Sequence, residues 1–221
     1  MKIYKGHLLF TKVQQQFKVI ENGYIAVENG KIKGVYTALP QEFENIPVED
    51  FGNRLLIPAM NDMHVHAPQY RNQGIAMDLE LLPWLNNYTF PEEIKYADTN
   101  YAERMYRRFV RDLWRYGTMR TVAFATIHQP ATRLLMQIFQ EAGMGAFVGK
   151  VDMNRNSPEA LCEKVEEAVR KNEELIKEFN TPHSIVKPII TPRFVPSCTP
   201  QMLKACGELA EKYQLPVQSH L

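Results

Sequence analysis

Short apolar runs alternate with helix-like segments from Leu55 onward, and this alternation restricts the fold more than any other feature of the sequence. The runs have the length of strands, and after the one that begins at Leu55 they cover residues 120–125, 146–151, 185–191 and 216–220. Each run but the last is followed by a helical pattern. Strands that alternate with helices form parallel sheets covered by those helices, so we predict an α/β fold.

Capping residues mark where the helices should begin and end. Gly117 and Gly143 each follow a helical pattern, where glycine commonly ends a helix in a left-handed conformation. Ser157 and Thr199 each precede a proline, which combines a hydroxyl N-cap with proline at the first helical position. We therefore expect helices to begin at both of these hydroxyl residues.

The first 54 residues have a different character. Short runs of alternating polarity flank Asn29-Gly30, a strong signal for a tight β-hairpin. We predict a small β subdomain over residues 1–54, the N-terminal part of a β-sandwich, followed by an α/β domain over residues 55–221.

The α/β domain has too few repeats to close a barrel. We count five strands and four complete helices in residues 55–221, whereas a closed barrel of this type needs eight of each. A chain that ends on an apolar strand would also leave an unpaired sheet edge. We therefore expect the first half of a barrel, truncated after its fifth strand, and part of a longer protein.

Composition excludes several functional classes. The chain has 45% apolar and 23% charged residues, typical of a globular protein, and its formal charge is +1. This balance gives no basic surface for nucleic acid or for an anionic membrane and favours a small, weakly charged ligand. The apolar run at the N-terminus is too short for a signal peptide, and no apolar run in the sequence is long enough to span a membrane. We therefore expect a cytoplasmic protein.

Three cysteines, Cys162, Cys198 and Cys206, lack the CxxC spacing of metal or redox motifs. We interpret them as reduced structural thiols.

Two histidines lie one residue apart in NDMHVHAPQY, directly after an apolar run. Residues i and i+2 of a strand point to the same face, so His64 and His66 can present their rings side by side. The pair alone is also compatible with two loop histidines without ligands. His220 favours a metal site, because it ends another strand of the same array and such strand ends converge.

The other histidines are less informative. His7 lies in the β subdomain and His183 beside a proline, and surface positions account for both. His128 directly follows a strand, so it either lines the site or has a loop or capping role.

Four further features leave alternatives open. Asp62 alternates with the histidine pair and could support an imidazole. Lys150 is best interpreted as structural, and Lys187 stands at the wrong end of its strand to bridge metals. Residues 67–100 form a long insertion, either a packing flap or a functional segment.

Six segments in order resemble the successive motifs of the guanine deaminase family, within the amidohydrolase superfamily. HAPQY together with TPRF distinguishes this family from its relatives better than the histidine pair does. The resemblance runs from the β subdomain to Leu221. The segments are PAMNDMHVHAPQY, LPWLNNYTFPEE, FATIH, FVGKVDMN, KPIITPRF and VQSHL.

The resemblance implies an incomplete TIM-type (β/α)8 amidohydrolase barrel with one zinc ion, which converts guanine and water to xanthine and ammonia. His64, His66 and His220 match three histidine ligands of the family. The purine-binding positions match Gln69, Arg193 and Phe194. These residue types suit the task, because a glutamine amide both donates and accepts, arginine offers a fork of donors, and phenylalanine can stack on a ring. Iron or cobalt would also bind three imidazoles, and the family implies a homodimer as the full-length protein.

The sequence departs from the family in its catalytic groups. The family's acid-base glutamate would lie just beyond Leu221, and a fourth histidine and an aspartate further still, so no catalytic carboxylate is expected within the chain. We therefore expect an inactive fragment of a guanine deaminase. Two alternatives stay open: a non-catalytic or split half-barrel that needs a complementary chain, and a related amidohydrolase that acts on another heterocycle.

Overall fold

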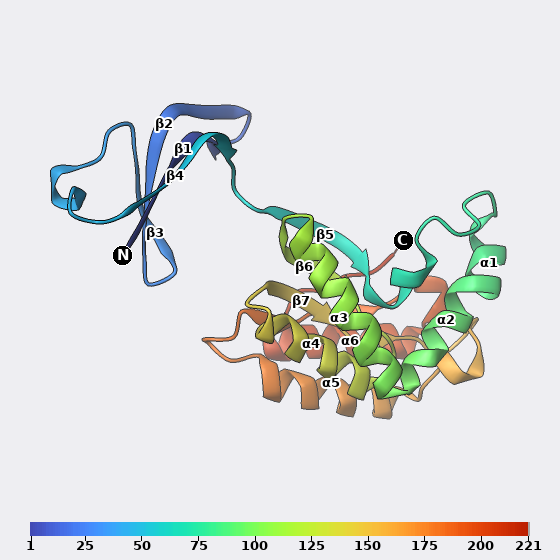
Figure 1. Ribbon diagram of the computed structural model, residues 1–221. Helices are drawn as coiled ribbons and strands as arrows, with labels where there is room; N and C mark the ends of the chain where they lie inside the picture. The colour runs from blue at the N-terminus through green and yellow to red at the C-terminus, as the bar shows by residue number, and fades with distance from the viewer. Residues whose placement is uncertain (221) are drawn as a thin grey trace. The chain divides into compact units, whose positions relative to one another are not determined.

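The computed structural model describes residues 1–220, which form two compact units (Figure 1). The boundary between the units falls between Ala59 and Met60 in the sequence, whereas the sequence pattern placed it between residues 54 and 55. The difference arises because Leu55 and Leu56 extend a strand of the first unit, where they pair with its first strand. The first barrel strand therefore begins only at Met60.

The first unit is a four-stranded sheet with the order β3-β2-β1-β4. The β2–β3 hairpin turns at Asn29 and Gly30, both with positive φ (52° and 74°), as the Asn-Gly signal predicted. Three buried residues, Ile3, Ala26 and Phe43, form its small core. The strands are β1 (Lys2–Val13), β2 (Gln16–Glu28), β3 (Lys31–Tyr36) and β4 (Val48–Leu56).

The second unit contains a parallel sheet with the order β5-β6-β7-β9, which confirms the predicted α/β class. A short parallel pair, β8 with β10, continues from the ends of β7 and β9. Residues 216–220 make only isolated parallel bridges, one of which joins Phe194 to His220. The strands are β5 (Met60–His66), β6 (Thr118–Phe124), β7 (Gly145–Gly149), β8 (Val151–Asp152), β9 (Val186–Pro188) and β10 (Thr191–Pro192).

Four long helices follow one another along one face of this sheet (Figure 1). Their apolar sides and the sheet enclose two buried clusters, centred on residues such as Phe139 and Met153. The helices are α3 (Thr99–Arg115), α4 (Gln129–Glu141), α5 (Val165–Phe179) and α6 (Pro200–Tyr213).

The helix boundaries agree with the sequence at three of four predicted caps. Gly117 and Gly143 have φ of 81° and 67°, and the Thr199 hydroxyl accepts a bond from the Met202 amide at 3.3 Å. The prediction that a helix begins at Ser157 is wrong. Only a 3-10 turn, Glu159–Leu161, forms there, because Pro158 has a ψ of 143°, which is not helical, and α5 begins at Val165. The Ser157 hydroxyl contacts the Met153 sulfur at 3.5 Å and caps no amide.

The insertion after β5 consists of short helical segments rather than an irregular loop. It places Glu92 and Glu93 in buried positions on α2. The segments are a 3-10 helix (Ala67–Asn72), α1 (Leu81–Trp84), a π-helical turn (Leu85–Thr89), α2 (Phe90–Ile94) and a second 3-10 turn (Lys95–Ala97). Across residues 1–220, every helix is too short or too polar to cross a membrane.

Candidate functional site

A bulge in β5 sets the direction of the two neighbouring histidines. Asp62 pairs with Thr121 of β6, but the next pair joins Val65 to Ala123, so β5 has one extra residue in this interval. The Asp62 carboxylate accepts a bond from the backbone amide of His64 at 3.1 Å. Asp62 therefore stabilises the bulged backbone and does not contact an imidazole as the sequence suggested.

Three imidazoles converge beyond the bulge. The Nε2 atom of His220 lies 3.2 Å from the Nε2 atoms of both His64 and His66. One ring nitrogen from each residue falls within 4.8 Å of the others, a group that could hold a metal ion. This geometry is consistent with the prediction that the three histidines come together from two strand ends.

The tautomer of His220 is set by a backbone contact. Its Nδ1 atom lies 2.7 Å from the carbonyl oxygen of Arg193, to which it donates. A neutral ring that donates from Nδ1 has an unprotonated Nε2. In its neutral form, His220 therefore directs the lone pair of Nε2 toward the other two imidazoles.

The electrostatic environment favours the neutral form of the two imidazoles of β5. Burial and then the neighbouring His220 lower the pKa of His64. Burial lowers the pKa of His66 well below its usual value, and the charge of Arg193 adds to this effect. Metal ligands must be unprotonated, so these shifts favour binding of a cation.

The spacing of the ring nitrogens fits one tetrahedral ion. Two nitrogens that each lie about 2.0–2.1 Å from the same tetrahedral zinc are roughly 3.3 Å apart. The 3.2 Å separations from His220 are close to this value. A single cation bound to the three nitrogens would use one lone pair from each ring, so the donor set fits a metal.

Phe124, the last residue of β6, forms a platform for all three imidazoles. It is fully buried and stacks on His66, with ring centroids 4.4 Å apart and an interplanar angle of 17°. Its ring centroid also lies 5.1 Å from that of His64 and 4.7 Å from that of His220. Sequence analysis missed this residue, although its position at the end of the neighbouring strand was a usable signal.

A cavity of about 400 Å³ opens directly onto the histidines. Gln69, Arg193 and Phe194 line it, so the predicted ligand-binding side chains and the histidines share one cavity. The insertion supplies apolar side chains to the same wall: Leu81, Trp84 and Leu85. The insertion therefore belongs to the site and is more than a packing flap.

Arg193 is buried, with an exposed fraction of 6%, and is held by the insertion. Its two terminal nitrogens bond to both carboxylate oxygens of Glu93, and its guanidinium lies over the Phe90 ring, 5.5 Å from the centroid. Gln69 also contacts Glu93, with Nε2 3.5 Å from Oε1. Sequence analysis did not identify Glu93, and the acidic pair in FPEE was the signal available.

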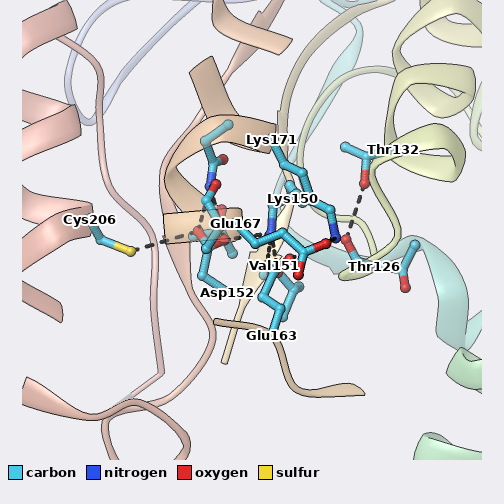
Figure 2. A network of polar contacts seen from close by, with 12 residues as sticks. Thr126, Thr132, Lys150, Val151, Asp152, Glu163, Glu167, Lys171 and Cys206 are labelled. Carbon is cyan, nitrogen blue, oxygen red and sulfur yellow. Dashed lines mark hydrogen bonds and ion pairs between the residues drawn. The ribbon is translucent and has the colours of Figure 1, made fainter. Parts of the chain in front are cut away.

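A second polar network surrounds Lys150 (Figure 2). Lys150 is fully buried and donates to Asp152 at 2.6 Å, to the Val151 carbonyl and to Glu163. Burial acts to lower the pKa of Lys150, but the two carboxylates outweigh it, so the pKa is raised. Lys150 is therefore a charged structural residue.

This network connects to the site through backbone bonds. Thr191-Pro192 of β10 pairs with Val151-Asp152 of β8, and the Arg193 amide donates to the Asp152 carbonyl at 3.1 Å. The cluster around Lys150 thereby holds the strand end from which Arg193 projects.

Two other candidates lie away from the cavity. The ammonium of Lys187 bonds to the Thr181 carbonyl, and this side chain lines a separate cavity with Asn61 and Met63. His128 precedes the first residue of α4 and does not line the histidine cavity.

Comparisons with known proteins identify the family of the chain. Residues 55–221 match the sequence model of the amidohydrolase family. The whole chain is 37% identical to guanine deaminase of Dictyostelium discoideum and covers 53% of that protein. Over 76% of its length it is 43% identical to a probable guanine deaminase of Schizosaccharomyces pombe, of which it covers 33%.

Solved structures give the same result. The structure of guanine deaminase from C. acetobutylicum with bound guanine matches the whole chain with a TM-score of 0.96 and 49% identity, and the chain covers 52% of it. The E. coli guanine deaminase matches with a TM-score of 0.87 and 28% identity. The chain thus spans about half the length of three of these relatives and a third of the fourth.

Proposed function

The chain belongs to the amidohydrolase family, and we propose that it carries the metal-binding and purine-binding part of a guanine deaminase. The reaction replaces the amino group of guanine by the oxygen of water and yields xanthine and ammonia. The observation that carries this proposal is the convergence of three imidazoles on a cavity that also contains Gln69, Arg193 and Phe194. The resemblance to guanine deaminases over the whole chain favours guanine over other heterocycles.

His64, His66 and His220 would hold a single divalent ion, zinc in our proposal and iron as the alternative. When bound, zinc supplies a water molecule whose pKa is lowered to about 7 and which is therefore a nucleophile at neutral pH. Phe124 packs against the rings and excludes bulk water from their far side.

The purine would bind beside this centre. Phe194 stacks on the ring, Arg193 donates to the carbonyl oxygen, and the Gln69 amide bonds to a donor and acceptor on the purine edge. This arrangement orients the amino-bearing carbon toward the imidazole cluster.

We further propose that the chain binds guanine but does not turn it over alone. Deamination needs a carboxylate to carry protons to the ring and to the departing ammonia. Within residues 1–220, the metal-binding group contains only histidines, and Glu93 is already occupied by Arg193. Proton transfer would therefore depend on groups that these residues do not provide.

Two properties of the whole protein are also proposed. The three cysteines are free thiols, which supports a reducing, cytoplasmic location. The homodimer that the resemblance implies stays a prediction.

The test is to load the purified chain with zinc, measure guanine binding by calorimetry, and follow xanthine by ultraviolet absorbance. We expect binding without xanthine formation. Xanthine production by the 221-residue chain would refute the need for further groups. Tighter binding of cytosine, adenosine or a triazine would refute guanine as the substrate.

A further inference from the structure

Glu93 holds two candidate purine-binding groups at once. Its carboxylate forms a two-point ion pair with the guanidinium of Arg193, a residue one hundred positions away in the sequence, and its Oε1 atom accepts from the Gln69 amide. Glu93 is 1% exposed and Arg193 6%, so water does not compete for this pair. Two-point arginine-carboxylate pairs are directional as well as strong.

The pair determines which guanidinium hydrogens remain for a ligand. Arginine has five N–H donors, and two are used by Glu93, one on each terminal nitrogen. The two parallel bonds to the carboxylate fix the orientation of the guanidinium, which also lies over the Phe90 ring, 5.5 Å from the centroid. The remaining donors therefore have one orientation before any ligand binds.

We propose that Glu93 is a positioning residue that sets the preference of the cavity for a purine with a carbonyl oxygen. This inference rests on the proposed function, because it assigns Arg193 to that oxygen. A site with fixed donors rejects a ligand that lacks the matching acceptor, since the buried donors are then left unpaired. Loss of Glu93 would free the guanidinium to rotate and would weaken this discrimination.

The neighbouring Glu92 provides a matched control. It lies on the same short helix, is 5% exposed, and bonds to Lys95 at 2.7 Å and to the Tyr101 hydroxyl. It does not line the histidine cavity. Substitution of Glu92 therefore removes an equally buried carboxylate without touching Arg193.

The experiment compares the zinc-loaded full chain with E93Q, E93D and E92Q. E93Q keeps the shape but presents an amide to the guanidinium, whereas E93D keeps the charge and is too short for the two-point pair. Affinities for guanine and for 2-aminopurine, which lacks the carbonyl oxygen, are measured by calorimetry. Circular dichroism and zinc affinity check that each variant is folded with an intact metal site.

We expect E93Q and E93D to lower the ratio of guanine affinity to 2-aminopurine affinity at least about tenfold, whereas E92Q should keep the wild-type ratio. The zinc affinity should be unchanged in all three variants. A purely structural role would weaken both ligands equally and leave the ratio unchanged, which would overturn the inference while the proposed function stands. If E93Q does not fold, E93D decides. Failure of both the wild type and E92Q to prefer guanine would overturn the proposed function itself.

Discussion

Replacing Lys150 by methionine tests the role assigned to the buried network of Figure 2. The ammonium bonds to Asp152 and Glu163, and all three side chains are at most 3% exposed. Methionine has a similar length but no charge, so K150M leaves two buried carboxylates without their shared cation. Breaking a buried ion pair from one side typically costs about 3–5 kcal/mol.

Part of this cost is offset by bonds that survive the substitution. Asp152 keeps two bonds from Asn172 at 2.9 and 3.0 Å, and Glu163 keeps Lys171 at 3.0 Å. We therefore expect a loss of unfolding free energy near 3 kcal/mol, the lower end of the range. With a urea m-value of about 2 kcal/mol per molar, the midpoint falls by roughly 1.5 M.

The assay is urea unfolding followed by tryptophan fluorescence. Both tryptophans, Trp84 and Trp114, lie in the second unit, so the signal reports that unit alone. K212M is the control, because Lys212 pairs with Glu173 at 2.7 Å but is 61% exposed, so its loss should leave the urea midpoint nearly unchanged. A K150M loss as small as that of K212M would refute the reasoning.

Three further predictions concern pH, metal and ligand. Burial and the charge of Lys171 lower the pKa of His128, so just below pH 6.5 the unfolded chain binds more protons than the folded chain and stability falls on acidification. H128Q should make the dependence of unfolding free energy on pH shallower by up to about 1.4 kcal/mol per pH unit. Urea titrations from pH 7.5 to 5.5 without metal measure this dependence, and an identical slope in H128Q would contradict the assignment. Zinc at about one hundred times its Kd should stabilise the chain by roughly 2.7 kcal/mol in thermal unfolding, and a chelator should reverse this stabilisation. If H66A keeps the full effect of zinc, His66 is not a ligand. F194L should weaken guanine binding by about 0.5–1.5 kcal/mol in calorimetry with zinc affinity unchanged, and an unaltered guanine affinity would argue against stacking.

The histidine cluster could be predicted because its signals are local. The spacing of His64 and His66 places both rings on one side of a strand, and His220 follows an apolar run that ends at the same edge of the sheet. Even here the bulge at Asp62 was not foreseen. An alternating pattern gives no sign that one residue is extra, because the bulge is defined only against the partner strand.

Long-range pairs and local competition explain what sequence analysis missed. Glu93 and Arg193 meet only through the tertiary fold, and neither side chain's neighbourhood in the sequence indicates the other. Ser157 has the residue pattern of an N-cap, but the backbone at Pro158 is extended and the Ser157 hydroxyl contacts Met153, so the local signal does not start a helix. The unit boundary shifted for a similar reason, because Leu55 and Leu56 suit either strand and pairing with β1 decides.

We propose above that imidazoles from two separate strand ends bind one metal ion at the purine cavity. X-ray absorption at the zinc edge of the chain with one equivalent of zinc tests it most directly. We predict nitrogen ligands at about 2.0–2.1 Å with an outer-shell signal from three imidazoles, reduced to two in H220Q. Sulfur ligands at about 2.3 Å, or a spectrum that H220Q leaves unchanged, would contradict the account.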